Sequence, residues 1–153
     1  MLRIGVISDT HGLLRAQALA SLAGSDYIVH GGDIGNPGIL EQLRAIAPLT
    51  VVRGNNDRQA WAAEVPHSAL LDLGEVKLCA VHDIATLDID PVAAGVQVVV
   101  YGHSHSPKAV WRAGVLYLNP GSAGPRRFKL PVSVAELLVD GASVTARLIE
   151  LAL

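Results

Sequence analysis

Leu2-Arg-Ile-Gly-Val-Ile-Ser8-Asp9-Thr-His11 opens the 153-residue chain and combines two signals. The run Leu2–Ser8 is almost entirely apolar, which is typical of a strand that is covered on both faces. A carboxylate, Asp9, and an imidazole, His11, follow this run at once. A short apolar run that ends in residues able to bind a metal ion recurs four more times along the chain.

The four further runs end in Gly32-Asp33, Gly54-Asn55-Asn56-Asp57, His82 and Gly102-His103-Ser-His105. Ligands of open α/β sheets bind at the carboxyl ends of strands, so we expect these segments to converge on one rim. Only oxygen and imidazole donors are present, and these suit divalent Mn, Fe, Zn or Ni. Two such ions that share a carboxylate are typical of phosphoester hydrolysis. Seven side chains are candidate ligands: Asp9, His11, Asp33, Asn55, His82, His103 and His105.

The remaining patterns predict the rest of the fold. In the first half, helices are expected at Leu14–Leu22 and from the N-cap Asn36 and Pro37 to about Ile46, between strands that pair in parallel. In the second half, Gly74-Glu75 and Asp140-Gly141 are hairpin signals, and a short helical stretch is expected around Pro91–Ala94. We therefore predict a single domain over residues 1–153, an α/β four-layer αββα sandwich of two mixed β-sheets with flanking helices.

Composition excludes several function classes. The net charge of −2 and the lack of a long basic run give no indication of nucleic-acid or anionic-membrane binding. The single cysteine, Cys79, excludes a disulfide framework and agrees with a cytoplasmic location. No apolar run approaches the ~20 residues of a membrane span, and the N-terminus is typical of a strand, not of a signal peptide.

Each motif alone is weak evidence, because Asp-x-His or Gly-Asn occurs freely in turns and helix caps. The complete ordered set, followed by Asn119-Pro-Gly-Ser122 and Pro125-Arg126 before a terminal hairpin, resembles the calcineurin-like metallophosphoesterase superfamily. The short chain is most similar to the compact YfcE-like phosphodiesterase family, which has the fold of the retromer subunit Vps29. The resemblance spans essentially the whole chain, and it implies that Asn119–Ser122 shapes the floor of the site.

The resemblance implies a role for each candidate. The first metal would be held by Asp9, His11, Asp33 and His105, and the second by Asp33, Asn55, His82 and His103. Asp33 would bridge two divalent ions, with Mn expected first and Ni, Fe or Zn as alternatives. A bridging hydroxide would attack the phosphorus of a small phosphodiester in line with the leaving group. The catalytic set is then Asp33, Asn55, Asn56 and His103, and substrate would be contacted by Asn56 and Arg126.

Two positions depart from the family pattern. Asn56 stands where many members carry a histidine that contacts the phosphate or protonates the leaving group. An amide cannot act as a general acid, although it can donate a hydrogen bond to a phosphoryl oxygen. We therefore expect activated aryl diesters to react better than alkyl diesters. Asp83 stands where glycine is commoner, which adds an anion near the site.

Several alternatives stay open. Asp57 either orients a ligand imidazole or caps a turn, and Arg126 either meets a substrate phosphate or is a solvated surface residue. His30 is expected to be a buried, hydrogen-bonded core histidine. The chain could instead be an inactive scaffold of the same fold or a phosphomonoesterase, and the sequence leaves a homodimer open.

Overall fold

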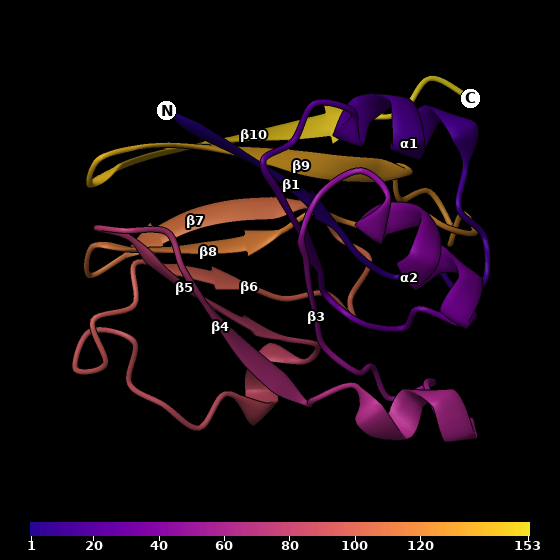
Figure 1. Ribbon diagram of the computed structural model, residues 1–153, viewed down its shortest axis with the longest axis horizontal. Coiled ribbons are helices and arrows are strands. Elements are labelled where there is room, and N and C mark those ends of the chain that lie inside the picture. The colour runs from indigo at the N-terminus through magenta and orange to yellow at the C-terminus, as the bar shows by residue number, and fades with distance from the viewer.

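Two five-stranded mixed sheets form the protein in the computed structural model, which describes residues 1–153 (Figure 1). The first sheet has the order β10-β9-β1-β2-β3. In it, β1 pairs in parallel with β2, and β2 with β3, whereas the C-terminal hairpin β9–β10 joins β1 in antiparallel orientation. Its strands are β1 (Leu2–Ile7), β2 (Tyr27–His30), β3 (Leu49–Val51), β9 (Ser133–Asp140) and β10 (Ser143–Glu150).

The second sheet has the order β4-β5-β6-β8-β7. Its three central strands are parallel, and each edge strand belongs to a hairpin. The parallel strands end at the same rim as β1, β2 and β3, so the loops that follow them meet those of the first sheet. Its strands are β4 (Ser68–Asp72), β5 (Lys77–Val81), β6 (Val98–Val100), β7 (Lys108–Arg112) and β8 (Val115–Asn119).

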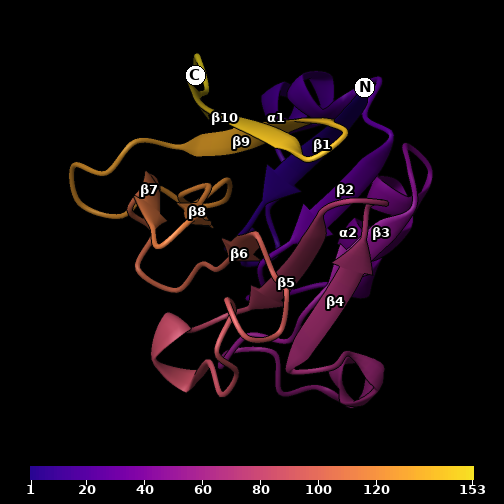
Figure 2. The ribbon, with the colours of Figure 1, turned by 90° about the vertical axis from the view of Figure 1, so that its left-hand side faces the viewer.

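The main core lies between the two sheets, which face each other in the view along the strands (Figure 2). It is built from aliphatic side chains of both sheets, among them Ile4, Val6, Leu78 and Leu116, all without exposed surface. A second core fills the space between the first sheet and the helices α1 (Ala16–Leu22) and α2 (Pro37–Arg44). These two cores confirm the predicted sandwich of two mixed sheets with outer helices.

The first half of the chain follows its local signals closely. Asn36 caps α2, because its side-chain oxygen accepts from the Gly38 N–H at 2.7 Å, and Pro37 is the first helical residue. Both helices are shorter than predicted: α1 begins at Ala16, and α2 ends at Arg44. A 3₁₀ helix, η1 (Ala60–Glu64), was not predicted.

The outer face of the second sheet is covered by loop rather than by an α-helix. A short 3₁₀ helix, η2 (Ile84–Thr86), and the segment after it pack Ile84 and Leu87 onto Cys79, Val81 and Val99. The predicted helical stretch at Pro91–Ala94 is wrong, because these residues form consecutive turns. Gly95 adopts φ +72° and ends the turns before a second helical turn can form. None of the helices has the length and apolar character needed to cross a bilayer.

Candidate metal centre

Backbone hydrogen bonds join the loops that follow the strands. The Asp9 N–H donates to the Gly32 carbonyl at 3.0 Å, and the His11 N–H donates to the Asp33 carbonyl at 2.9 Å. Between the sheets, the His103 N–H donates to the Asp9 carboxylate at 3.2 Å. The parallel ladder of β1 and β2 therefore continues into the loops and places their side chains side by side.

The backbone conformation at the candidate ligands is unusual. Seven non-glycine residues have positive φ, and five of them are predicted ligands: Asp9, His11, Asp33, His103 and His105, at φ +54°, +47°, +56°, +72° and +62°. Left-handed conformations cost L-residues roughly 1–3 kcal/mol each and persist only where the surroundings enforce them. Five of these seven strained residues therefore lie at the predicted site, and strained backbone clusters at active sites and ligand-binding loops.

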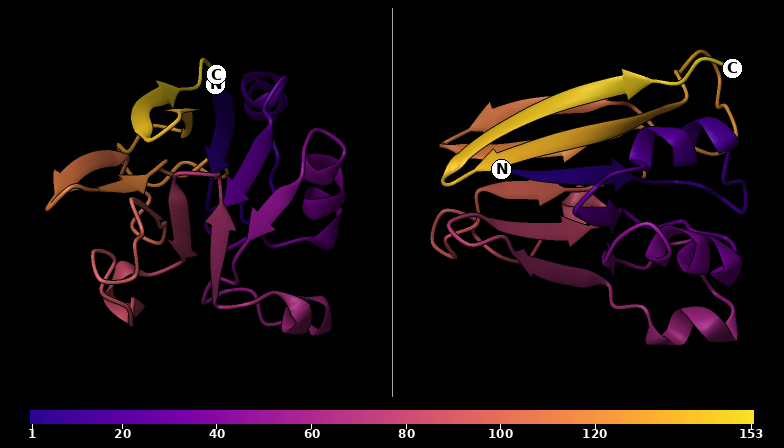
Figure 3. Two further views of the ribbon diagram at one scale, coloured as in Figure 1. Left: turned by 60° about the vertical axis from the view of Figure 1, so that its left-hand side comes forward. Right: turned by 45° about the horizontal axis from the view of Figure 1, so that its top comes forward.

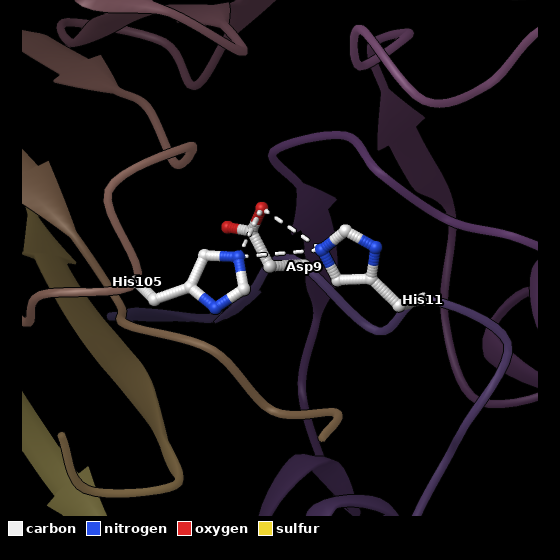
Figure 4. A group of neighbouring side chains, drawn as sticks. All are labelled: Asp9, His11 and His105. Atoms are coloured by element: carbon white, nitrogen blue, oxygen red, sulfur yellow. Dashed lines mark hydrogen bonds and ion pairs between the residues drawn. The ribbon is translucent and has the colours of Figure 1, made fainter. Parts of the chain in front are cut away.

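Asp9, His11 and His105 form one compact group (Figure 4). The His11 and His105 Nε2 atoms lie 3.3 Å apart, and Asp9 Oδ1 lies 3.8 Å from the former and 3.4 Å from the latter. Asp9 and His105 are buried and His11 is partly exposed. The three donor atoms therefore face one small volume, as three protein ligands of one ion must.

Asp9 also belongs to a second, fully buried group with Asp33 and His82. His82 Nε2 lies 3.3 Å from Asp33 Oδ2 and 3.9 Å from Asp9 Oδ1. The His82 Nδ1–H donates to the Gly31 carbonyl at 2.8 Å, so Nε2 is the ring nitrogen that faces the carboxylates. Asp33 Oδ2 is also 3.6 Å from His11 Nε2, so this carboxylate lies between the two histidines that the resemblance gives to different ions.

The carboxylates and imidazoles perturb one another. Burial lowers the pKa of His82, but Asp33 and Asp9 outweigh burial and raise that pKa above its ordinary value. Burial raises the pKa of Asp33, but the His82 imidazole and the Asn56 amide N–H outweigh burial and hold that pKa well below its ordinary value. Asp33 is therefore ionised near neutral pH.

Asn55 and His103 lie at the exposed mouth of the site, outside the two compact groups. They contact each other, with His103 Nδ1 3.2 Å from Asn55 Oδ1. Asn56 holds Asp33 twice: its backbone N–H donates to Oδ1 at 2.9 Å and its side-chain amide donates to Oδ2 at 3.1 Å. The amide predicted to meet a phosphoryl oxygen is thus used on the carboxylate. Arg126 is exposed and makes no hydrogen bond or ion pair with any site residue.

Asp57 resolves one of the open alternatives. It is buried, and its carboxylate accepts from the backbone N–H groups of Ile34, Gly35 and Gly54 at 2.9 to 3.1 Å. It contacts no imidazole by hydrogen bond, so the turn-capping interpretation is correct. Because Ile34 follows Asp33 and Gly54 precedes Asn55, Asp57 ties together two loops that carry predicted ligands.

His30 is a core residue, as predicted. Its Nδ1 accepts from the Gly32 N–H at 3.0 Å, and its Nε2 lies 3.0 Å from the Thr10 hydroxyl, which donates to the Ile34 carbonyl. Burial lowers the pKa of His30 to about 4, more than the nearby Asp9 raises it, so the ring is neutral.

Sequence reasoning missed two polar residues that support the site, Ser8 and Thr10. Ser8 donates its hydroxyl to Asp9 Oδ2 at 2.8 Å, and the Thr10 hydroxyl, which contacts His30, donates to the Ile34 carbonyl at 2.8 Å. Ser122, which the resemblance places at the floor of the site, donates to the Asp9 carbonyl at 3.0 Å. The Asn119 side-chain amide donates to the Gly102 carbonyl at 3.1 Å, in agreement with the predicted role of Asn119–Ser122 as the floor. Their position directly beside a predicted ligand was the available signal for Ser8 and Thr10.

The residues present fit a metal centre. Asp9 Oδ1 and His82 Nε2 are buried and have no hydrogen-bond partner, although such atoms are normally satisfied in native proteins. Both face the volume shared by the carboxylates and imidazoles. Hard oxygen and borderline nitrogen donors in this proportion suit a divalent first-row ion.

Comparison with known proteins agrees with this chemistry. Residues 2–141 match the family model of the calcineurin-like phosphoesterase superfamily domain. A probable metallophosphoesterase of Methanothermobacter thermautotrophicus is 33% identical over 95% of this chain and 91% of its own length. The phosphodiesterase YfcE of Escherichia coli is 29% identical over 95% of this chain and 92% of its own length. The crystal structure of Chaetomium thermophilum Vps29 superposes with a TM-score of 0.81 at 21% identity, over 95% of this chain and 86% of that one. The chain therefore belongs to the calcineurin-like phosphoesterase superfamily and, within it, to the YfcE-like family.

Proposed function

We propose that this protein is a two-metal phosphodiesterase that hydrolyses small phosphodiesters. Its relative YfcE is named a phosphodiesterase. The observation that carries the proposal is the pair of three-residue groups that share Asp9, together with the unpartnered buried atoms that face them. Two divalent ions, when bound there, supply hydroxide near neutral pH and polarise the phosphoryl oxygens. We expect Mn first. Ni, Fe and Zn are alternatives because the donor set suits all four ions.

The roles of the residues follow from where they lie. The first ion would be held by Asp9, His11, Asp33 and His105, and the buried side of the second by Asp33 and His82. Asn55 and His103 would complete the second site from the solvent side. Because Asn55 and His103 are exposed, we propose that substrate approaches from their side. Asn56 holds the Asp33 carboxylate in place through two hydrogen bonds.

The chain supplies no general acid at the leaving-group side. Asn56 cannot donate a proton, and Arg126 is too poorly connected to the site to compensate for missing positive charge. We therefore propose that diesters with good leaving groups are the preferred substrates. A phosphomonoesterase is disfavoured for the same reason, because a dianionic monoester needs more neutralising charge or more leaving-group assistance.

An inactive scaffold is the alternative from another class, and the structural likeness to Vps29 is the observation that favours it. The retained set of seven ligand side chains argues against it, because a binding module has no need of them. We further propose that residues 1–153 act as one domain, since a single core joins both sheets. A cytoplasmic location stays a prediction, as does a homodimer.

The test is hydrolysis of bis(p-nitrophenyl) phosphate by protein stripped with a chelator and then supplied with Mn²⁺, Ni²⁺, Zn²⁺ or Mg²⁺. The parent is compared with Asp33→Asn, which keeps the shape of the bridging ligand, and with Asp140→Asn, an exposed residue that serves as the matched control. We expect metal-dependent turnover in the parent and the control and its loss in Asp33→Asn. A folded parent without turnover in any metal would reject the phosphodiesterase and leave the scaffold.

A further inference from the structure

A polar pocket of about 370 Å³ adjoins the exposed side of the candidate metal centre. Asn55 and His82, which are predicted ligands of one ion, form part of its wall. The rest of the wall comes from the residues after β3, from the start of β4, and from the segment between the end of β5 and the residues after η2. Four charged or titratable residues there have no role in the metal centre: Arg53, His67, Asp83 and Asp88. We call this cavity the Arg53 pocket.

Arg53 is the unusual member of the wall. Its guanidinium is always charged, yet no carboxylate lies within ion-pair distance of it. Its Nη2 donates to His67 Nε2 at 2.6 Å, and an imidazole nitrogen carries no negative charge to balance the guanidinium. Its Nε is buried and has no hydrogen-bond partner. A partly buried guanidinium without a carboxylate partner can bind a phosphate or carboxylate oxygen through its remaining donors.

Acceptors share the pocket with this cation. Asp83 accepts from the Ala85 N–H at 3.0 Å and lies 4.0 Å from His103 Nε2, and Asp88 is exposed. These carboxylates disfavour an occupant that is only an anion. An occupant that has hydroxyl groups as well as an anion satisfies both the carboxylates and Arg53. A phosphorylated sugar has both kinds of group.

We infer that the Arg53 pocket binds a second phosphate group of the substrate, carried on a hydroxyl-bearing sugar, while the scissile phosphodiester lies at the metal centre. The inference rests on the proposed function and narrows it to sugar phosphodiesters that bear a further phosphate. Arg53 donates to the second phosphate, and the chemistry of the metal centre is unchanged.

Two chromogenic substrates that differ by one phosphate provide the test. Uridine 5′-(p-nitrophenyl phosphate) is compared with its 3′-phosphorylated form, which keeps the free 2′-hydroxyl, and in both cases water adds to phosphorus as the bond to p-nitrophenolate breaks. For the Mn²⁺-loaded parent we expect kcat/KM to be about tenfold or more higher with the 3′-phosphate, the size of a charge-assisted contact. Arg53→Gln should bring this ratio near one, and Arg53→Lys should leave an intermediate ratio. Arg44→Gln, an exposed arginine of α2, is the matched control and should keep the parent ratio.

The outcomes separate the inference from the proposed function. A ratio near or below one in a parent that hydrolyses bis(p-nitrophenyl) phosphate overturns the inference and leaves the phosphodiesterase standing. An equal fall in kcat/KM for both substrates in Arg53→Gln also overturns the inference, because Arg53 would then act on the fold or on the scissile phosphodiester. If no substrate is hydrolysed, calorimetric binding of uridine 3′,5′-bisphosphate and uridine 5′-monophosphate decides. Tighter binding of the bisphosphate that is lost in Arg53→Gln supports the inference, and equal binding rejects it.

Discussion

Replacement of Asp57 by asparagine removes one charged acceptor oxygen from the centre of the site while it keeps the shape of the side chain. In the protein, one oxygen accepts from Ile34 and Gly35, and the other accepts from Gly54 and, more weakly, from Ile34. An asparagine amide donates where one of those oxygens accepts. At least one buried N–H therefore loses its acceptor, and the remaining bonds lose the carboxylate charge.

The expected cost follows from these contacts. One unsatisfied buried N–H costs about 1–3 kcal/mol, and loss of charge from the remaining hydrogen bonds costs about 1 kcal/mol each. We therefore expect Asp57→Asn to lower the free energy of unfolding by about 3–5 kcal/mol in urea titrations of chelator-treated protein. Because the two tethered loops carry Asp33 and Asn55, metal affinity should also fall by about 10- to 100-fold.

Asp72 provides the matched control for this measurement. It accepts a single N–H, that of Gly74, in an exposed turn. Asp72→Asn should therefore change the free energy of unfolding by less than about 0.5 kcal/mol. Equal stabilities of Asp57→Asn and Asp72→Asn would refute the tether.

Three further experiments test other parts of the site. The pKa of His30 is about 4 in the folded protein, against an ordinary value of 6.5. Between these two pH values the unfolded chain binds more protons than the folded chain. The contribution of His30 to the free energy of unfolding is therefore complete above pH 6.5 and is lost as the pH falls toward 4. The loss should reach about 3 kcal/mol across that interval in urea titrations of the parent and should be absent from His30→Asn; equal slopes would contradict it. Asn56→Ala loses the side-chain contact to Asp33 and should lower kcat/KM about tenfold, whereas Asn56→His should flatten the dependence of rate on leaving group; a series of aryl and alkyl diesters measures both, and unchanged slopes would count against the leaving-group argument. Mn²⁺ at 100 times the dissociation constant of the parent should stabilise the parent by about 2.7 kcal/mol in calorimetric scans. An identical gain in Asp9→Asn at the same Mn²⁺ concentration would exclude Asp9 as a ligand.

The strands and candidate ligands were predictable because their signals are local. Leu2–Ser8 and Tyr27–His30 are short apolar runs that end at once in a turn or a polar residue, and parallel strands necessarily end on one rim. The order of strands was not predictable. β1 pairs with β9, whose residues lie about 130 positions further along the chain, and nothing in either strand specifies that partner.

The features of the site that the sequence did not predict also depend on contacts between residues that lie far apart in the chain. Whether Asp57 meets an imidazole or caps a turn depends on Ile34 and Gly35, which reach it from another loop. Arg53 gave no signal, because its exceptional property is that no carboxylate lies within ion-pair distance of it in the folded chain. Only the folded chain shows which charges remain unpaired.

The three hairpin turns all lie at the end of the sandwich opposite the metal centre (Figure 3). They are centred on Gly74, Gly114 and Gly141, and the N-terminus lies beside them, because Leu2 pairs with Val139. Exposed turn tips are the places where proteins accept inserted segments most readily. A fluorescent reporter, an affinity tag or a solid support attached at Gly141 would therefore leave the candidate metal centre facing solution. The two ends of the sandwich therefore differ: one carries the candidate metal centre, and the other carries turns that can be modified.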